Sequence, residues 1–229
     1  MKPKDLNPPF SERSERRVLI DDRIWYVPDK DHPECSFAFP GWNHPDLFGN
    51  DNPVHVEYCS GNGAWIASKA QQNPDINWVA LEIKFKRCRK IWSKIHNLKL
   101  NNLIVICGEG LRTTRDYFPE ESISHAYVNF PDPWPKKRHA KNRIIQPPFI
   151  SEVARVLKLE APFTLVTDDA DYSLQMIETL QEHHAFDSSL PAPYFVDDWN
   201  HYGSSYFDSL WRERGRQIRY HQFIRQKAS

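Results

Sequence analysis

The feature that most constrains the fold is an alternation of apolar runs with helix-like patterns, which begins at Val54. The apolar runs predict strands over residues 54–59, 77–83, 103–107, 126–130 and 162–167. The segments between and after them predict helices over residues 64–72, 85–97, 111–118, 149–157 and 171–184. Strands that alternate with helices form βαβ units with right-handed crossovers. The sequence therefore predicts an α/β fold with a mostly parallel sheet.

The segments on either side of this region have different patterns. Aromatic-rich pieces at residues 194–196, 205–207 and 217–220 predict antiparallel strands at the C-terminal edge of the sheet. The first 51 residues show little periodicity and many prolines. We therefore expect a partly irregular N-terminal arm over residues 1–51 and one domain over residues 52–229.

Charge and cysteine content narrow the class of protein. The chain has 30 Lys and Arg and 30 Asp and Glu, so its formal net charge is +0 and any affinity for nucleic acid must come from local patches. The cysteines, Cys35, Cys59, Cys88 and Cys107, lack zinc-like spacing, which predicts reduced thiols and no metal site. No stretch has the pattern of a signal peptide or a membrane span. We expect a cytoplasmic protein that does not associate with a membrane.

Gly61 and Gly63 lie in the turn between the first predicted strand and helix of the α/β region. Glycine lets a ligand approach the backbone, and the following helix N-terminus offers free N–H groups. A dinucleotide-binding fingerprint requires a third glycine where this chain has Ile66, and the lysine of a phosphate-binding loop is missing as well. The turn therefore predicts a ligand other than a dinucleotide.

Acidic residues mark the ends of three successive predicted strands. Glu57 precedes the glycine turn, Glu82 ends the second strand and Glu109 follows the third. An acid beside the turn repels pyrophosphate and attracts a cation, and Glu82 is placed to accept from both hydroxyls of a ribose. S-Adenosylmethionine carries an ammonium and a sulfonium group and no phosphate. These residues, together with Gly61 and Gly63, therefore favour it as the cofactor.

A proline-rich loop, residues 129–143, follows the fourth predicted strand with the sequence Asn-Phe-Pro-Asp-Pro-Trp-Pro-Lys-Lys-Arg-His-Ala-Lys-Asn-Arg. Its prolines exclude both a helix and a central strand. It carries one carboxylate, Asp132, and one large ring, Trp134, and then becomes cationic. A loop of this kind at a strand end predicts that a flat polar ring is bound at its edge while a polyanion is held nearby.

These segments resemble the bacterial tRNA (guanine-N7-)-methyltransferase family, whose signature loop is similar to residues 129–139. Other segments that match in order and spacing are Leu47–Asn50, Glu57 with Ser60–Gly63, Leu81–Ile83, Thr167–Asp168 and Ser205–Asp208 with Gly215. The resemblance implies a Rossmann-like class I methyltransferase fold that depends on S-adenosylmethionine. It also implies methyl transfer to N7 of a guanosine in the variable loop of tRNA.

The resemblance assigns residues to both ligands. It places Asp132 with Glu57, Glu82 and Glu109 around the cofactor. The residues that it implies for the tRNA guanosine are Lys136, Asp168, Ser205, Tyr206, Phe207 and Asp208. The family usually has glycine at the position of Cys59, whose restricted φ predicts weaker cofactor binding, and threonine at that of Ser205. We expect a monomer or a homodimer.

The implied reaction makes few demands on the protein. Guanine N7 has a free lone pair at neutral pH, so no general base is required. The site must align the reacting atoms, exclude water and stabilise positive charge on the purine. Asp132 and Asp168 are the candidate catalytic residues, acting through the N1–H and exocyclic N–H groups of the base.

Three other functions fit parts of the pattern. A methyltransferase for another nucleic-acid or protein substrate would carry Asn/Asp-Pro-Pro-aromatic where this chain has Pro-Asp-Pro-Trp. A non-catalytic tRNA-binding protein fits a loss of cofactor binding through Cys59, although the retained acidic residues argue against it. A nicotinamide-dependent oxidoreductase would need the missing glycine.

Overall fold

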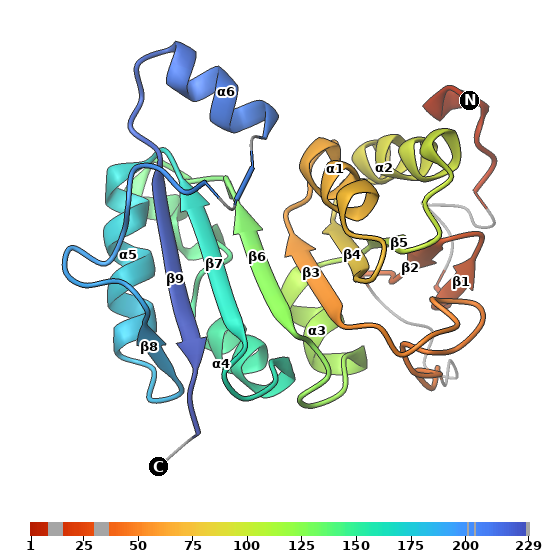
Figure 1. The fold of residues 1–229 in the computed structure, drawn as a ribbon, viewed down its shortest axis with the longest axis horizontal. Helices are drawn as coiled ribbons and strands as arrows, with labels where there is room; N and C mark the ends of the chain where they lie inside the picture. Colours follow the sequence, from red (N-terminus) through yellow and green to blue (C-terminus); the bar gives the residue numbers. More distant parts are fainter. Residues whose placement is uncertain (9–15, 30–36, 201, 204, 228–229) are drawn as a thin grey trace. The chain divides into compact units, whose positions relative to one another are not determined.

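The computed structural model describes residues 1–8, 16–29, 37–200, 202–203 and 205–227. The chain divides into two compact units, residues 1–119 and 120–229. Each unit combines β-strands with helices, and Figure 1 shows them coloured along the sequence.

The first unit has the strand order β1-β2-β5-β4-β3. Its strands are β1 (Leu19–Asp21), β2 (Ile24–Tyr26), β3 (Val54–Tyr58), β4 (Asn77–Glu82) and β5 (Leu103–Cys107). Its helices are α1 (Ala64–Gln72), α2 (Phe85–Leu98) and α3 (Gly110–Tyr117), with a 3-10 turn η1 (Pro3–Asp5). All neighbouring strands pair in parallel except β1, which pairs antiparallel with β2. The strands and helices predicted between residues 54 and 118 are confirmed within one residue at each end.

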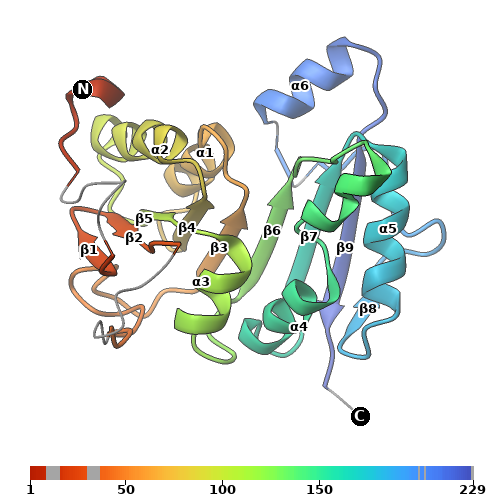
Figure 2. The same ribbon diagram turned by 180° about the vertical axis from the view of Figure 1, so that it is seen from behind.

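Burial explains why these segments take these forms. Every residue of β5 is buried, as its unbroken apolar run requires. Helix α2 buries Phe85, Cys88, Ile91 and Ile95, spaced three or four residues apart, and carries its cationic residues between them. Helices α1 and α2 lie side by side on one face of these strands, whereas α3 lies on the other face (Figures 1 and 2).

The second unit has the strand order β6-β7-β9-β8. Its strands are β6 (His125–Asn129), β7 (Pro162–Thr167), β8 (Phe186–Ser188) and β9 (Arg219–Arg225). Its helices are α4 (Pro147–Val156), α5 (Ala170–Gln181) and α6 (Tyr206–Glu213), with a 3-10 segment η2 (Lys137–Asn142). Strands β6 and β7 are parallel, and β9 is antiparallel to both β7 and β8. The predicted α/β class with antiparallel C-terminal strands is therefore confirmed.

Two details of the predicted C-terminal strands are wrong. Residues 205–207 do not form a strand, because the Ser205 side chain caps a helix that begins at Tyr206. Residues 194–196 contribute only an isolated bridge between Val196 and Tyr220. The third predicted strand is found as β9, which starts two residues later and continues to Arg225.

Cys59, Cys88 and Cys107 are free thiols, as expected, whereas Cys35 lies outside the described residues. None of the helices in the described part of the chain is both long enough and apolar enough to cross a lipid bilayer.

The glycine turn after β3 requires its small residues for different reasons. Gly61 and Gly63 both have positive φ values, 56° and 67°, which strain any residue with a side chain. A Cβ atom at Gly63 would lie 2.6 Å from Cγ1 of Ile91 in α2, but at Gly61 the nearest atom would be 3.9 Å away. Gly63 is therefore fixed by packing as well as by backbone conformation.

We expect Gly63→Ala to lower the free energy of unfolding more than Gly61→Ala, the matched control. Both variants incur the left-handed backbone cost of about 1–2 kcal/mol, and Gly63→Ala adds an overpacking cost of about 1–3 kcal/mol. Chemical denaturation of the three proteins measures the difference. Equal losses would contradict the role given to Ile91.

Candidate active site

The turn between β3 and α1 forms one part of the site. Glu57 is buried near the end of β3, and its backbone carbonyl accepts a hydrogen bond of 2.8 Å from the Ser60 hydroxyl. The carbonyl of Ser60 in turn accepts from the Gly63 N–H at 2.8 Å. Cys59 has a φ of 59°, a conformation in which glycine is favoured. The turn thus keeps its left-handed conformation although Cys59 carries a side chain.

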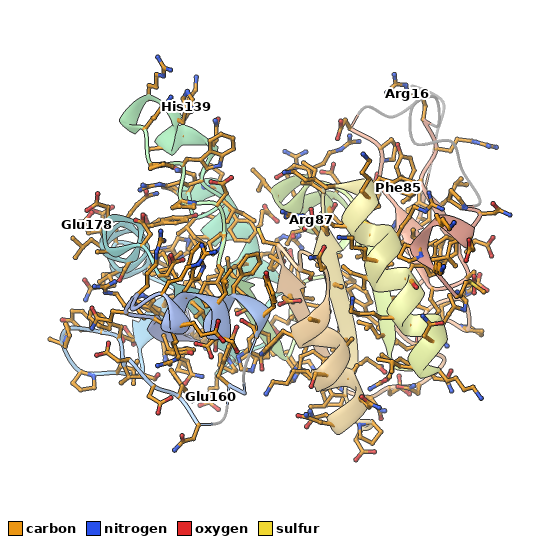
Figure 3. The ribbon with its side chains drawn as sticks, turned by 90° about the horizontal axis from the view of Figure 1, so that it is seen from above. Arg16, Phe85, Arg87, His139, Glu160 and Glu178 are labelled. Carbon is orange, nitrogen blue, oxygen red and sulfur yellow. The ribbon has the colours of Figure 1, made fainter. Side chains whose placement is uncertain are left out.

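Glu82 connects this turn to the end of β4. Its side chain is buried, and one carboxylate oxygen accepts from the Gly61 N–H at 2.9 Å while the other accepts from the Lys84 N–H at 2.8 Å. Arg87 on the first turn of α2 lies 3.6 Å from the same carboxylate, and Figure 3 labels it beside Phe85. Each carboxylate oxygen has two lone-pair directions, so Glu82 retains acceptor capacity for a ligand.

Glu109 has a structural role that the sequence analysis did not predict. It is the N-cap residue of α3, and its carboxylate accepts from the N–H groups of Leu111 at 3.0 Å and Arg112 at 2.7 Å. The helix start after β5 explains why an acid is favourable at this position. Its predicted contact with the cofactor remains a prediction.

The pKa of the Cys59 thiol depends on the charges around the turn. Burial, together with the negative charges of Glu82, Glu57 and Glu109, raises the pKa of this thiol to about 12. The three acids that the sequence placed at successive strand ends therefore converge on one turn, where their field disfavours an anion and favours a cation. Cys59 itself stays protonated near neutral pH.

The proline-rich loop after β6 belongs to the second unit. Phe130 and Trp134 have positive φ values, 47° and 42°, and the Trp134 N–H donates to the Asp132 carboxylate at 3.1 Å. This side-chain turn holds the exposed carboxylate in place. The Trp134 ring packs edge-on against His139, with centroids 5.8 Å apart.

Arg143 anchors the far end of this loop, a role that sequence reasoning missed. Its Nε donates to the Pro133 carbonyl at 2.7 Å, and its guanidinium lies 4.7 Å from the ring centroid of Tyr172 in α5. The Tyr172 hydroxyl accepts from the Ile145 N–H at 3.2 Å. Arg143 is one of the cations of this loop, and these contacts give it a role in the shape of the loop.

The exposed cations of the loop lie around η2. Lys136, Arg138 and Lys141 are exposed, and the side chain of Lys137 is outside the described part of the structure. Arg138 donates to His139 at 3.1 Å, and Figure 3 shows His139 at the outer end of the segment. No group of three or more potential metal ligands occurs among the described residues.

Asp168 follows the end of β7 and is mostly shielded from solvent. A terminal N–H of Arg216 donates to its Oδ2 atom, and Arg216 comes from the segment between α6 and β9. Asn129 and Val166 are paired across β6 and β7, so Asp132 and Asp168 follow adjacent strand ends. The pairing of Asp168 with Arg216 was not predicted from the sequence.

The predicted substrate segment starts helix α6, which lies beyond the carboxyl ends of β6 and β7 (Figure 1). The Ser205 hydroxyl accepts from the Asp208 N–H at 3.0 Å. The buried Asp208 carboxylate accepts from Arg212 at 2.8 Å and from Tyr220 at 3.0 Å. Burial raises the pKa of the Tyr220 hydroxyl to about 12, so it stays a donor. Ser205 and Asp208 thus hold the start of the helix and join it to β9.

Tyr206 and Phe207 are the members of this segment that are available for contact. Tyr206 is 62% exposed. Phe207 packs against Phe130 of the proline-rich loop, with ring centroids 6.0 Å apart, and stacks on Trp211 at 6.5 Å. The start of the loop and the start of α6 are therefore joined through aromatic rings.

The comparisons with known sequences agree over nearly the whole chain. A family model described as "Putative methyltransferase" matches residues 51–220. The tRNA (guanine-N(7)-)-methyltransferase of Chlamydia felis is 42% identical over 225 residues, which cover 98% of each chain. That of Chlamydia pneumoniae is 42% identical over 227 residues with the same coverage.

Solved structures share the fold at low sequence identity. An antibiotic-related methyltransferase has 16% identity and a TM-score of 0.55, covering 79% of this chain and 90% of that chain. An rRNA methylase from Streptococcus thermophilus has 14% identity and a TM-score of 0.51, covering 78% and 89%. These likenesses confirm the Rossmann-like class I methyltransferase fold. The 42% identity to the curated relatives, over 98% of each chain, shows that the chain belongs to the tRNA (guanine-N(7)-)-methyltransferase family.

Proposed function

We propose that this protein transfers a methyl group from S-adenosylmethionine to N7 of a guanosine in the variable loop of tRNA, in the cytoplasm. The observation that carries the proposal is the 42% identity, over 98% of both chains, with curated tRNA (guanine-N(7)-)-methyltransferases. A second observation supports it. The proline-rich loop and Asp168 lie at adjacent carboxyl ends of parallel strands, where α/β folds bind ligands.

The residues of the first unit fit a cationic nucleoside cofactor. The backbone at Gly61 is not crowded, because the nearest atom to an added Cβ would be 3.9 Å away, and Glu57, Glu82 and Glu109 give the turn a negative field. We assign the ribose hydroxyls to Glu82 and the cationic end of the cofactor to the vicinity of Glu57. The bound cofactor would supply an electrophilic methyl group.

The residues of the second unit would bind and orient the guanosine. Asp132 and Asp168 accept from the N1–H and 2-amino groups of the base, which become more acidic as positive charge develops on the purine. Tyr206 is exposed enough to stack on a base, an interaction that RNA-binding proteins commonly use. No side chain needs to remove a proton, because the N7 lone pair is already free.

The exposed cations of the proline-rich loop would hold the RNA backbone. Lys136, Arg138 and Lys141 are exposed, and Arg143 fixes the loop that carries them. Phosphate contacts of this kind set register and supply much of the affinity.

The first prediction tests the reaction and the charge of Asp132 together. The purified protein, incubated with labelled S-adenosylmethionine and unmodified tRNA, should produce 7-methylguanosine, detected by mass after digestion of the RNA. Asp132→Asn should lower the rate by about 10- to 1000-fold, the range for one electrostatic contact. Asparagine keeps the acceptor for the Trp134 N–H and so preserves the turn.

Asp187→Ala is the matched control, because Asp187 is an exposed aspartate on β8 of the same unit. It should leave the rate unchanged. RNA binding without any 7-methylguanosine from the wild-type protein would refute the proposed reaction and favour a non-catalytic tRNA-binding protein. A normal rate in Asp132→Asn would remove the catalytic role of Asp132 alone.

A second prediction concerns the phosphate contacts. Lys136→Gln should weaken tRNA binding and make the slope of log affinity against log salt less steep by about one unit, as the loss of one phosphate contact requires. Lys158→Gln, an exposed lysine before β7, should change neither quantity. Filter binding at several salt concentrations gives both values. A slope that is the same in all three proteins would count against the assignment of Lys136.

A third prediction concerns Cys59→Gly. Glycine relieves the positive φ, so this variant should raise the free energy of unfolding at pH 7 by about 1 kcal/mol. The folded-state pKa of the thiol is raised to about 12, above its unfolded value near 9, so the stability it contributes is present below pH 9 and lost as pH rises toward 12. The advantage of the glycine variant should therefore grow above pH 9. Denaturant titrations at pH 7 and pH 10 test this, and a constant difference would contradict it.

A further inference from the structure

We propose that Arg216 is a specificity-determining residue that occupies the Asp168 carboxylate in the absence of RNA and yields it to the guanine base. This inference rests on the proposed function and uses only residues of the second unit. It begins from one contact, in which a terminal N–H of Arg216 donates to Oδ2 of Asp168.

The backbone of Arg216 is fixed by the end of helix α6. Gly215 has a φ of 71°, and its N–H donates to the Arg212 carbonyl at 2.9 Å. The N–H of Arg216 donates to the Trp211 carbonyl, also at 2.9 Å. This pair of bonds is a Schellman motif, which ends the helix and directs the following residue. These bonds position the backbone of Arg216 so that its side chain reaches Asp168.

The exposure of the Arg216 and Asp168 side chains is compatible with replacement of Arg216 by a base. The Asp168 side chain is 12% exposed and that of Arg216 is 52% exposed. The guanidinium of Arg216 also lies 4.2 Å from the ring centroid of Trp211. A half-exposed cation on an aromatic ring can leave its carboxylate without losing all of its contacts. The more shielded Asp168 then needs a new donor.

Guanine offers a donor of the kind that Arg216 provides through its single N–H contact with Asp168. The N1–H and 2-amino groups of guanine flank one carbon atom, as two N–H groups flank the central carbon of a guanidinium, and groups of both kinds can donate to a carboxylate. Arginine at Asp168 therefore stands in for the Watson–Crick edge of the base. Adenine and the pyrimidines lack this pair of donors, so they cannot replace Arg216 as well. The exchange favours guanine over the other bases.

The cost of displacing Arg216 is small, because ion pairs with one exposed partner contribute little to stability. A small cost is what a substrate-displaceable contact requires. If Arg216 is displaced by the base, its removal should strengthen binding of the base. If Arg216 only contacted a phosphate, its removal would weaken binding of the tRNA.

The test uses guanosine, which has no phosphate, as an inhibitor of tRNA methylation by the full-length protein. Arg216→Gln should lower the inhibition constant of guanosine by about two- to fivefold, the range expected for loss of a part-exposed ion pair. The gain should be smaller for inosine, which lacks the 2-amino group. Arg214→Gln is the matched control, because the Arg214 guanidinium lies 5.2 Å from the same Trp211 ring. It should leave both inhibition constants unchanged.

A second measurement supplies free guanidinium ion to Arg216→Gln in place of the missing guanidinium group. Guanidinium chloride at millimolar concentration should raise the guanosine inhibition constant of Arg216→Gln back toward the wild-type value, while sodium chloride at equal concentration should not. An unchanged or larger constant in Arg216→Gln, an equal change in Arg214→Gln, or no inhibition by guanosine in any of the proteins would overturn the proposal. Absence of 7-methylguanosine from the wild-type protein would instead refute the proposed function, so the two failures are distinct.

Discussion

The position of the glycine turn in the first unit depends on the hydrogen bonds of the buried Glu82 carboxylate. The carboxylate accepts from the backbone of the glycine turn and from the backbone at the start of α2, so it joins the ends of two parallel strands. A buried charge of this kind is tolerable only when such hydrogen bonds are made. Because both oxygens are held by backbone N–H groups, the position of the turn and the position of its negative charge are set by the same contacts.

The second unit achieves rigidity by other means. Its proline-rich loop contains residues with strained backbone conformations, and Arg143 and Tyr172 hold its far end. Strain of this kind persists only where surrounding contacts enforce it. A loop that is already ordered loses little conformational freedom when a base binds, which leaves more of the interaction energy for affinity.

Much of the fold could be predicted because the patterns are local. The apolar run of β5 and the three-to-four spacing in α2 specify their structures without reference to the rest of the chain. Residues 205–207 were misjudged because their aromatic content suggested a strand, although a serine three residues before an acid is a helix-start pattern. The pairing of Arg216 with Asp168 joins residues 48 apart and depends on the register of β9 beside β7. No local pattern could have predicted it.

Because of the Schellman motif at Gly215, the movement of Arg216 away from Asp168 can be much faster than catalytic turnover. The backbone of Arg216 is fixed by the end of α6, so its guanidinium can leave Asp168 by side-chain rotation alone. Exposed side chains change rotamer within about picoseconds to nanoseconds, whereas enzymes typically turn over at about 1–1000 per second. The exchange at Asp168 therefore equilibrates many times during each catalytic cycle. The exchange therefore affects the fraction of bound bases that are correctly positioned. It does not slow the methyl-transfer step.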